Sequence, residues 1–135
     1  MTDPVGTIVA DFGEAAVADV VRRFYAKVRH DDVIGPLYPP DDWEQAERRL
    51  RLFLVQRFGG PTTYDAERGH PRLRMRHAPF AITPDGARRW LELMAAALEE
   101  SVAAGACPPE LPPRVWDFFV GTATFLVNRP PDTEP

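Results

Sequence analysis

Apolar residues recur at helical spacing in four stretches of the chain, and proline and glycine separate these stretches. In the first stretch they are Ala16, Val17, Val20, Val21, Phe24, Tyr25 and Val28. Because side chains three and four residues apart share one face of an α-helix, this pattern predicts a helix of about three turns. Prolines at positions 36, 39 and 40 should prevent any helix from continuing beyond it.

The second stretch predicts a helix that begins at Asp41 or Asp42 and ends before the glycines at 59–60. Its expected apolar face consists of Trp43, Ala46, Leu50, Phe53 and Leu54. Gln45 follows Asp42 by three residues, which is the spacing of a capping box. Both side chains should therefore bind free amide groups of the first turn.

The third and fourth stretches predict two more helices. Thr83 is the expected N-cap of the third, which should start at Pro84 and end at Gly105. The fourth should open after Pro112 or Pro113. The apolar faces consist of Ala87, Trp90, Leu91, Met94, Ala97 and Leu98 in the third and of Val115, Phe118, Phe119, Thr122 and Leu126 in the fourth, which Asn128 and Pro130 terminate. No stretch alternates apolar and polar residues as a half-buried strand would, so the sequence predicts an all-α fold.

The segment from Thr62 to Ile82 has no long periodic pattern and is interrupted by glycine and proline. Loops longer than about 12–15 residues are uncommon inside compact domains, and most of them are functional or disordered. Apolar side chains are too frequent here for disorder, although four arginines stand among them. We expect a loop with one short helix, from about Pro71 to Ala78, that directs His77 inward.

The composition is that of one globular domain. The chain has 135 residues, of which 44% are hydrophobic and 27% charged. A net charge of −4 does not indicate a nucleic-acid-binding surface. No apolar run approaches the roughly 20 residues of a membrane helix, and the N-terminus lacks a signal-peptide pattern. We therefore expect a cytoplasmic protein with neither nucleic acid nor membrane as a partner.

Few residues could bind a metal ion. Cys107 is the only cysteine, which excludes an internal disulfide and the Cys-x-x-Cys-His motif of covalent haem attachment. No His-Glu-x-x-His motif or acid–histidine cluster indicates zinc or non-haem iron. No Ser–His–Asp arrangement and no glycine-rich phosphate loop can be recognised either.

The three histidines are the remaining candidate ligands. His30 follows the first helix among charged residues and is expected at the surface, while His70 precedes a proline and should be extended. His77 lies four residues after Leu73 and three before Phe80, so it should share their apolar face. A lone histidine on such a face is more often a core residue than a ligand, and the spacing alone leaves both alternatives open.

Three aromatic residues with polar tips fall on inward or corner positions of three different elements. Tyr25 and Trp90 lie on the apolar faces of the first and third helices, and Tyr38 lies in the proline-rich corner between the first two. A buried hydroxyl or indole N–H needs a hydrogen-bond partner. Each residue taken singly fits ordinary core packing, but together the three could line one polar cavity.

Five sequence segments, taken in their order along the chain, resemble the truncated haemoglobins of group II. The most specific is GHPRLRMRHAPF at 69–80, and the others are RRFYAKV at 22–28, LYPPDD at 37–42, ERRLRLFLVQRFGGPTTY at 47–64 and FLVNRP at 125–130. The resemblance covers residues 20–130 and implies a truncated, two-over-two globin fold. Four main helices would form two antiparallel pairs, and a short helix would carry the proximal histidine.

The resemblance also implies how the chain is divided. Residues 1–135 would be one haem-binding globin domain with an N-terminal extension, 1–13, and a C-terminal tail, 129–135. The family often has a Gly-Gly pair before its first main helix, whereas this chain has Phe12-Gly13. We therefore leave the arrangement of the first fifteen residues open.

The resemblance implies a non-covalent haem b between the second and third helices, with His77 as the iron ligand. The other ring nitrogen of His77 should donate to the Leu73 carbonyl, since iron-bound histidines commonly hold their second nitrogen in this way. Tyr25, Tyr38 and Trp90 match the distal residues that would donate hydrogen bonds to O2. The other expected cofactor contacts are Arg49, Tyr64 and Arg76 at the propionates, Ala46, Leu50, Phe53 and Leu54 along the distal wall, and Met75 and Phe80 beside His77.

The implied function is binding of O2 and other diatomic gases. Two or three hydrogen-bond donors predict slow O2 release, which favours O2-linked redox chemistry, such as nitric oxide or peroxide detoxification, over rapid transport. Dioxygenase- or peroxidase-like turnover would need a reductase that the sequence does not identify, and a monomer and a homodimer both stay open. The alternative is a haem-free helical bundle that binds a small apolar ligand or a protein partner.

Overall fold

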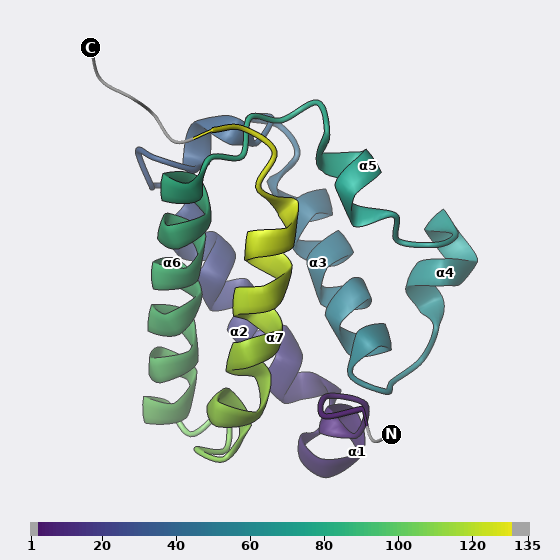
Figure 1. Cartoon of the computed structure of the whole chain (residues 1–135). Helices are drawn as coiled ribbons and strands as arrows, with labels where there is room; N and C mark the ends of the chain where they lie inside the picture. Colours follow the sequence, from purple (N-terminus) through teal and green to yellow (C-terminus); the bar gives the residue numbers. More distant parts are fainter. Residues whose placement is uncertain (1–2, 131–135) are drawn as a thin grey trace.

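Four long helices make up most of the computed structural model, which describes residues 3–130 (Figure 1). The α-helices are α1 (Ile8–Phe12), α2 (Glu14–Val28), α3 (Trp43–Arg57), α4 (Thr63–Arg68), α5 (Leu73–His77), α6 (Pro84–Ala103) and α7 (Leu111–Leu126), and η1 (Gly35–Leu37) is a short 3-10 helix. The described residues contain no strand, so the prediction of an all-α fold is confirmed. Residues 1–2 of the predicted extension and 131–135 of the predicted tail lie outside the described residues.

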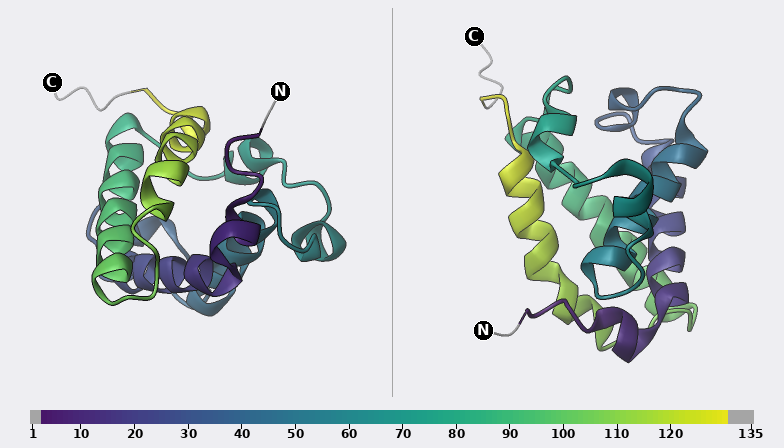
Figure 2. Two further views of the ribbon diagram at one scale, coloured as in Figure 1. Left: turned by 90° about the horizontal axis from the view of Figure 1, so that it is seen from below. Right: turned by 90° about the vertical axis from the view of Figure 1, so that its right-hand side faces the viewer.

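The long helices form two antiparallel pairs, α2 with α3 and α6 with α7 (Figure 1). The pairs are joined where α2 packs against α6. The right-hand view of Figure 2 separates the two pairs and shows α4 and α5 in front of the space between them. This is the two-over-two arrangement that the sequence predicts.

The apolar face of α2 is the centre of the core. Its buried residues are Ala16, Val17, Val20, Val21, Phe24, Tyr25 and Val28, which are the residues predicted from spacing. Burying one large apolar side chain contributes about 1.5–3 kcal/mol, so this face accounts for much of the fold's stability. On α3 and α6, in contrast, the predicted residues Leu50, Phe53 and Trp90 are only half-buried.

The predicted helix ends are confirmed at some positions and wrong at others. Thr83 caps α6 as predicted, because its hydroxyl accepts a hydrogen bond from the Gly86 amide at 3.0 Å. The helix α3 follows Asp42, but no capping box forms there. The Asp42 carboxylate instead accepts from the Arg49 guanidinium at 2.5 Å. A charged partner two turns further along competes successfully for the capping oxygen.

The start of the last helix and the segment 62–82 also differ from the prediction. The last helix starts at Leu111, so Pro112 and Pro113 lie inside its first turn, where a missing amide hydrogen costs nothing. The segment 62–82 contains two short helices rather than one, because α4 precedes α5. The extension 1–13 contains α1, and its Ile8 is fully buried in the core. Among residues 3–130, no helix combines the length and the apolar character needed to cross a bilayer.

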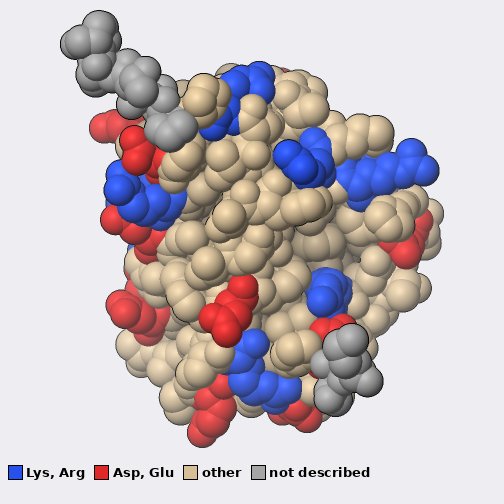
Figure 3. Space-filling view, in the orientation of Figure 1, with Lys and Arg blue, Asp and Glu red and all other residues tan. Residues whose placement is uncertain are grey.

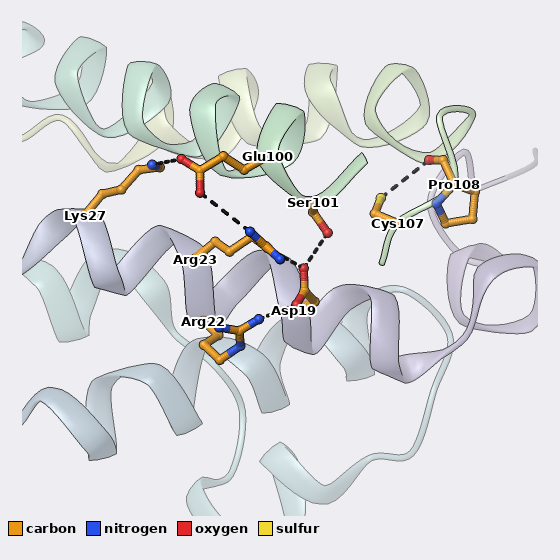
Figure 4. Close-up of polar contacts among 8 residues, drawn as sticks. All are labelled: Asp19, Arg22, Arg23, Lys27, Glu100, Ser101, Cys107 and Pro108. Carbon is orange, nitrogen blue, oxygen red and sulfur yellow. Dashed lines mark hydrogen bonds and ion pairs between the residues drawn. The ribbon is translucent and has the colours of Figure 1, made fainter. Parts of the chain in front are cut away.

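A polar network joins α2 to α6 (Figure 4). The hydroxyl of the fully buried Ser101 donates to the Asp19 carboxylate at 2.6 Å, and Arg23 donates to the same carboxylate at 2.7 Å. Glu100 pairs with Lys27 in the same network. Burial acts to raise the pKa of Asp19, but hydrogen bonds from Ser101, Arg23 and Arg22 outweigh it and lower the pKa to about 2 from its ordinary 3.8.

Asp19→Asn should therefore destabilise the fold by about 2 kcal/mol at pH 7. Because the folded pKa lies below the ordinary value, the stabilisation is present above about pH 4 and is lost as the pH falls through about 2. In urea unfolding at pH 7 and at pH 2, Asp19→Asn should have a much lower free energy of unfolding than the wild type only at pH 7. Asp85→Asn is the control, since Asp85 pairs with Arg88 at an exposed position and should change little. An equal loss for Asp19→Asn at both pH values would contradict the assignment.

Candidate functional site

The three aromatic residues singled out by the sequence come together between α2 and α6. The rings of Tyr25 and Tyr38 meet edge to face with their centroids 5.7 Å apart. The Trp90 ring lies 4.9 Å from that of Phe24, the neighbour of Tyr25 on α2. Tyr38 enters the cluster because η1 turns the chain back towards α2 immediately before it. The three rings thus belong to one aromatic cluster, and their lining of a common cavity stays a prediction.

The hydroxyl groups of both tyrosines are held neutral. Burial raises the pKa of Tyr25 well above its ordinary value, and the neighbouring Tyr38 raises it further. Burial also raises the pKa of Tyr38, although hydrogen bonding to Tyr25 and Trp90 offsets part of that effect. Both hydroxyl groups therefore keep a hydrogen that they could donate to a ligand.

Trp43 is a member of this cluster that sequence reasoning assigned only to an apolar face. Its ring stacks on Tyr38 with the centroids 5.3 Å apart and the planes inclined by 30°. The guanidinium carbon of Arg29 lies 5.6 Å from the Trp43 ring centroid on α3. The sequence could have indicated this contact, because Trp43 follows directly after the proline-rich corner that contains Tyr38. Trp43 therefore packs against the Tyr38 ring.

His77 is the last residue of α5, and its ring is half-buried. The ring Nδ1 lies 2.7 Å from the Leu73 carbonyl oxygen, which confirms the predicted contact. Because a carbonyl oxygen can only accept, Nδ1 carries the hydrogen, and Nε2 has the lone pair that could bind a metal. His30 is exposed, as expected, and His70 is exposed as well.

The residues around His77 lie less far inward than predicted. The helix α5 ends at His77, so Phe80 lies beyond it in a turn and is 38% exposed. The prediction that Phe80 shares one helical face with His77 and Leu73 is therefore wrong. Met75 is 59% exposed. As cofactor contacts, Met75 and Phe80 stay predictions.

The helix α3 contributes both buried and half-buried apolar side chains. Ala46 and Leu54 are buried there, whereas Leu50 and Phe53 are half-buried and leave apolar surface uncovered. Tyr64 from α4 is also buried, and its ring centroid lies 5.7 Å from that of Phe53. Apolar side chains of α3 and α4 thus pack against each other through Phe53 and Tyr64.

The two arginines expected at the propionates both have partners within the protein. Arg49 pairs with Asp42, and Arg76 donates to the backbone carbonyls of Arg68 at 2.8 Å and Pro71 at 2.9 Å. Figure 3 shows basic side chains over α5 and towards α4, at the edge of a largely uncharged surface that continues over α7. Carboxylate binding by Arg49 or Arg76 would exchange these partners and stays a prediction.

The chemistry of these side chains fits an amphipathic cofactor better than a bare metal ion. No group of three or more histidine, cysteine or acidic side chains within residues 3–130 could hold a metal ion alone. The site instead offers one histidine nitrogen, uncovered apolar surface on α3, and arginines at its edge. A planar, largely apolar metal complex with carboxylate groups has the matching chemistry.

Comparison with known proteins assigns the chain to a family. A family model described as bacterial-like globin matches residues 11–111. The group 2 truncated haemoglobin of Bacillus subtilis (strain 168) is 41% identical over 121 residues, which are 87% of this chain and 85% of that protein. The chain belongs to the group II truncated haemoglobins. This confirms the resemblance found in the sequence.

Two crystal structures of bacterial haemoglobins extend the comparison. A thermostable haemoglobin from the actinobacterium Thermobifida fusca is 46% identical, with a TM-score of 0.78, over 86% of this chain and 91% of that one. The truncated oxygen-avid haemoglobin of Bacillus subtilis is 31% identical, with a TM-score of 0.81, over 94% of this chain and 100% of that one. Membership of this family implies a haem cofactor and diatomic ligand binding, which disfavours the haem-free alternative.

Ala46 provides a test of the predicted distal wall in this truncated haemoglobin. Ala46 is only 4% exposed on α3, so Ala46→Leu should crowd the expected wall and cost about 1–3 kcal/mol of stability. Carbon monoxide association after flash photolysis should slow. The ferrous–CO vibrational frequency should barely move, because neither side chain can donate a hydrogen bond. A large frequency shift would contradict the assignment of Ala46 to this wall.

Proposed function

We propose that this truncated haemoglobin binds O2 at a haem iron held by His77, releases it slowly, and uses it in redox chemistry rather than rapid transport. The observation that carries the proposal is the cluster of Tyr25, Tyr38 and Trp90, which gathers three hydrogen-bond donors at one place. The similarity to a haemoglobin described as oxygen-avid supports slow release.

Two sets of residues would hold the cofactor. His77 would bind through Nε2, because its Nδ1 hydrogen is fixed on the Leu73 carbonyl. Arg49, Tyr64 and Arg76 would face the carboxylates, and apolar side chains on α3 would cover one side of the ring. A haem iron supplies an open coordination position for a diatomic ligand when one histidine binds its other side.

The distal residues would act on the bound ligand. Bound O2 attracts electron density and becomes a good hydrogen-bond acceptor, so Trp90 and Tyr38 would donate to it. Both tyrosine hydroxyls keep their hydrogens at neutral pH because burial raises their pKa values. A hydrogen bond to a charged acceptor is worth about 1.5–3 kcal/mol, or roughly ten- to a hundredfold in residence time.

Slow release suits a reaction in which O2 is consumed where it is bound. Nitric oxide is the co-substrate that we favour, because NO, O2 and one electron together give nitrate with no atoms left over. A reductase would have to return that electron to the protein after each turnover. Peroxide is the other candidate substrate for the same site.

The test is to mix the O2-loaded protein with nitric oxide in a stopped-flow spectrometer. We expect the spectrum to change faster than O2 dissociates, with one nitrate formed for each protein molecule. If nitric oxide only replaced O2 at the rate of O2 release, and no nitrate formed, the proposed reaction would be wrong. A purified protein without a Soret band would refute haem binding itself.

A further inference from the structure

The helix that carries His77 cannot hold its own position. It has five residues, none of them buried, and no side chain caps its first turn. Arg72, which precedes it, has a left-handed backbone conformation with φ of 45°, which residues other than glycine rarely adopt. So short a helix is not stable by itself, because its few hydrogen bonds do not repay the cost of nucleation. Contacts from elsewhere in the chain must fix α5.

Asn128, just beyond the end of α7, supplies those contacts on one side. Its side-chain Nδ2 donates to the backbone carbonyl of His77 at 3.2 Å and to that of Phe80 at 3.0 Å. Its Oδ1 accepts from the Ile82 amide at 3.0 Å, and its own amide donates to the Ile82 carbonyl at 2.9 Å. One side chain thus joins the end of α7 to both ends of the turn that follows α5.

The orientation of the Asn128 amide is determined by these partners. Carbonyl oxygens accept and the Ile82 amide donates, so the reversed amide would place an oxygen against two oxygens. Both hydrogens of Nδ2 are used on backbone carbonyls, which leaves none for a ligand. Asn128 is therefore suited to positioning the chain and not to contacting substrate.

Arg76 fixes the opposite end of the same helix. Its guanidinium donates to the carbonyls of Arg68 and Pro71, both of which precede α5. The helix is thus bound through hydrogen bonds at each end in place of a buried face. At its far end the bonds converge on His77, whose ring is held by Leu73 and whose backbone is held by Asn128.

We propose that Asn128 is a positioning residue for His77 and sets the tilt of the imidazole towards the iron. The inference rests on the proposed role of His77 as the iron ligand. Without Asn128, the turn 77–82 would be released from α7, and the ring would sample more orientations. Iron ligation would continue, but with a weaker and more variable bond.

The test compares Asn128→Ala and Asn128→Asp in the haem-loaded protein. Asn128→Asp has nearly the same shape and keeps an acceptor for the Ile82 amide, but loses both donors to the carbonyls. Thr124→Ala is the control, because the Thr124 hydroxyl also bonds a backbone carbonyl of α7, that of Val120, without reaching the turn 77–82. The readouts are the iron–histidine stretching band of the ferrous protein and haem transfer to apomyoglobin.

We expect both Asn128 variants to shift and broaden the band and to release haem about tenfold faster, as loss of one or two hydrogen bonds predicts. Thr124→Ala should match the wild type in both readouts. A wild-type band in Asn128→Asp would overturn the proposal, whatever happens to thermal stability, and so would an equal shift in Thr124→Ala. If Asn128→Ala does not fold, Asn128→Asp decides alone. A wild-type protein without this band would instead refute His77 as the ligand.

Discussion

Replacing His77 with alanine should abolish the five-coordinate ferrous spectrum and reduce haem retention by at least a hundredfold. Even the loss of a residue that only orients a metal ligand typically costs about 10–100-fold in affinity, and the loss of the ligand itself costs more. In this protein the Nε2 of His77 is the nitrogen with a free lone pair, because Nδ1 faces the Leu73 carbonyl. Spectra of the purified variant and haem transfer to apomyoglobin measure the effect.

His70→Ala is the matched control, seven residues earlier in the same segment. His70 is exposed, and its Nδ1 accepts from the Arg72 amide at 3.2 Å, so its removal should leave spectrum and haem retention intact. Added imidazole should restore part of the ferrous spectrum in His77→Ala, since it can occupy the space of the missing ring. Loss of the spectrum in His70→Ala with an intact His77→Ala would reverse the assignment.

Helical spacing predicted the core of this fold well because one face of α2 is covered along its whole length. Each apolar residue predicted there is buried. The same reasoning was less accurate on α3 and α6, where Leu50, Phe53 and Trp90 follow the spacing but remain half-buried. Periodicity shows which residues share a face, but it cannot show whether a neighbour or a cavity lies opposite that face.

Side-chain contacts between segments far apart in the chain could not be predicted from the sequence. The capping box at Asp42 failed because Arg49 offers a charged donor that the capping pattern does not consider. Asn128 looked like a helix terminator, and its bonds to the turn after His77 appear only once α7 folds back beside α5. Such side-chain bonds to the backbone have no periodic signal. The cluster of Tyr25, Tyr38 and Trp90 could be suggested because all three had polar tips on inward positions.

Trp90 should be the principal donor to bound ligand, and its replacement by phenylalanine should show this. The indole has one donor and no acceptor, so it cannot offer a lone pair to a ligand whichever way it turns. Its ring is held between Phe24 of α2 at 4.9 Å and Phe119 of α7 at 5.7 Å. Phenylalanine keeps that packing and removes only the donor. We expect O2 dissociation to quicken by roughly ten- to a hundredfold, the value of one charge-assisted hydrogen bond.

The competing candidate is Tyr38, and the structure makes the comparison sharp. The Tyr38 ring meets that of Tyr25 with the centroids 5.7 Å apart, and its hydroxyl carries a hydrogen that can turn towards a ligand. A hydroxyl can rotate and accept instead, however, whereas the indole donor is fixed in direction by its two aromatic neighbours. Tyr38→Phe should therefore quicken O2 release less than Trp90→Phe does, when both are measured by stopped-flow displacement with carbon monoxide. Wild-type release from Trp90→Phe, with fast release from Tyr38→Phe, would make the tyrosine the anchor and reverse this ranking.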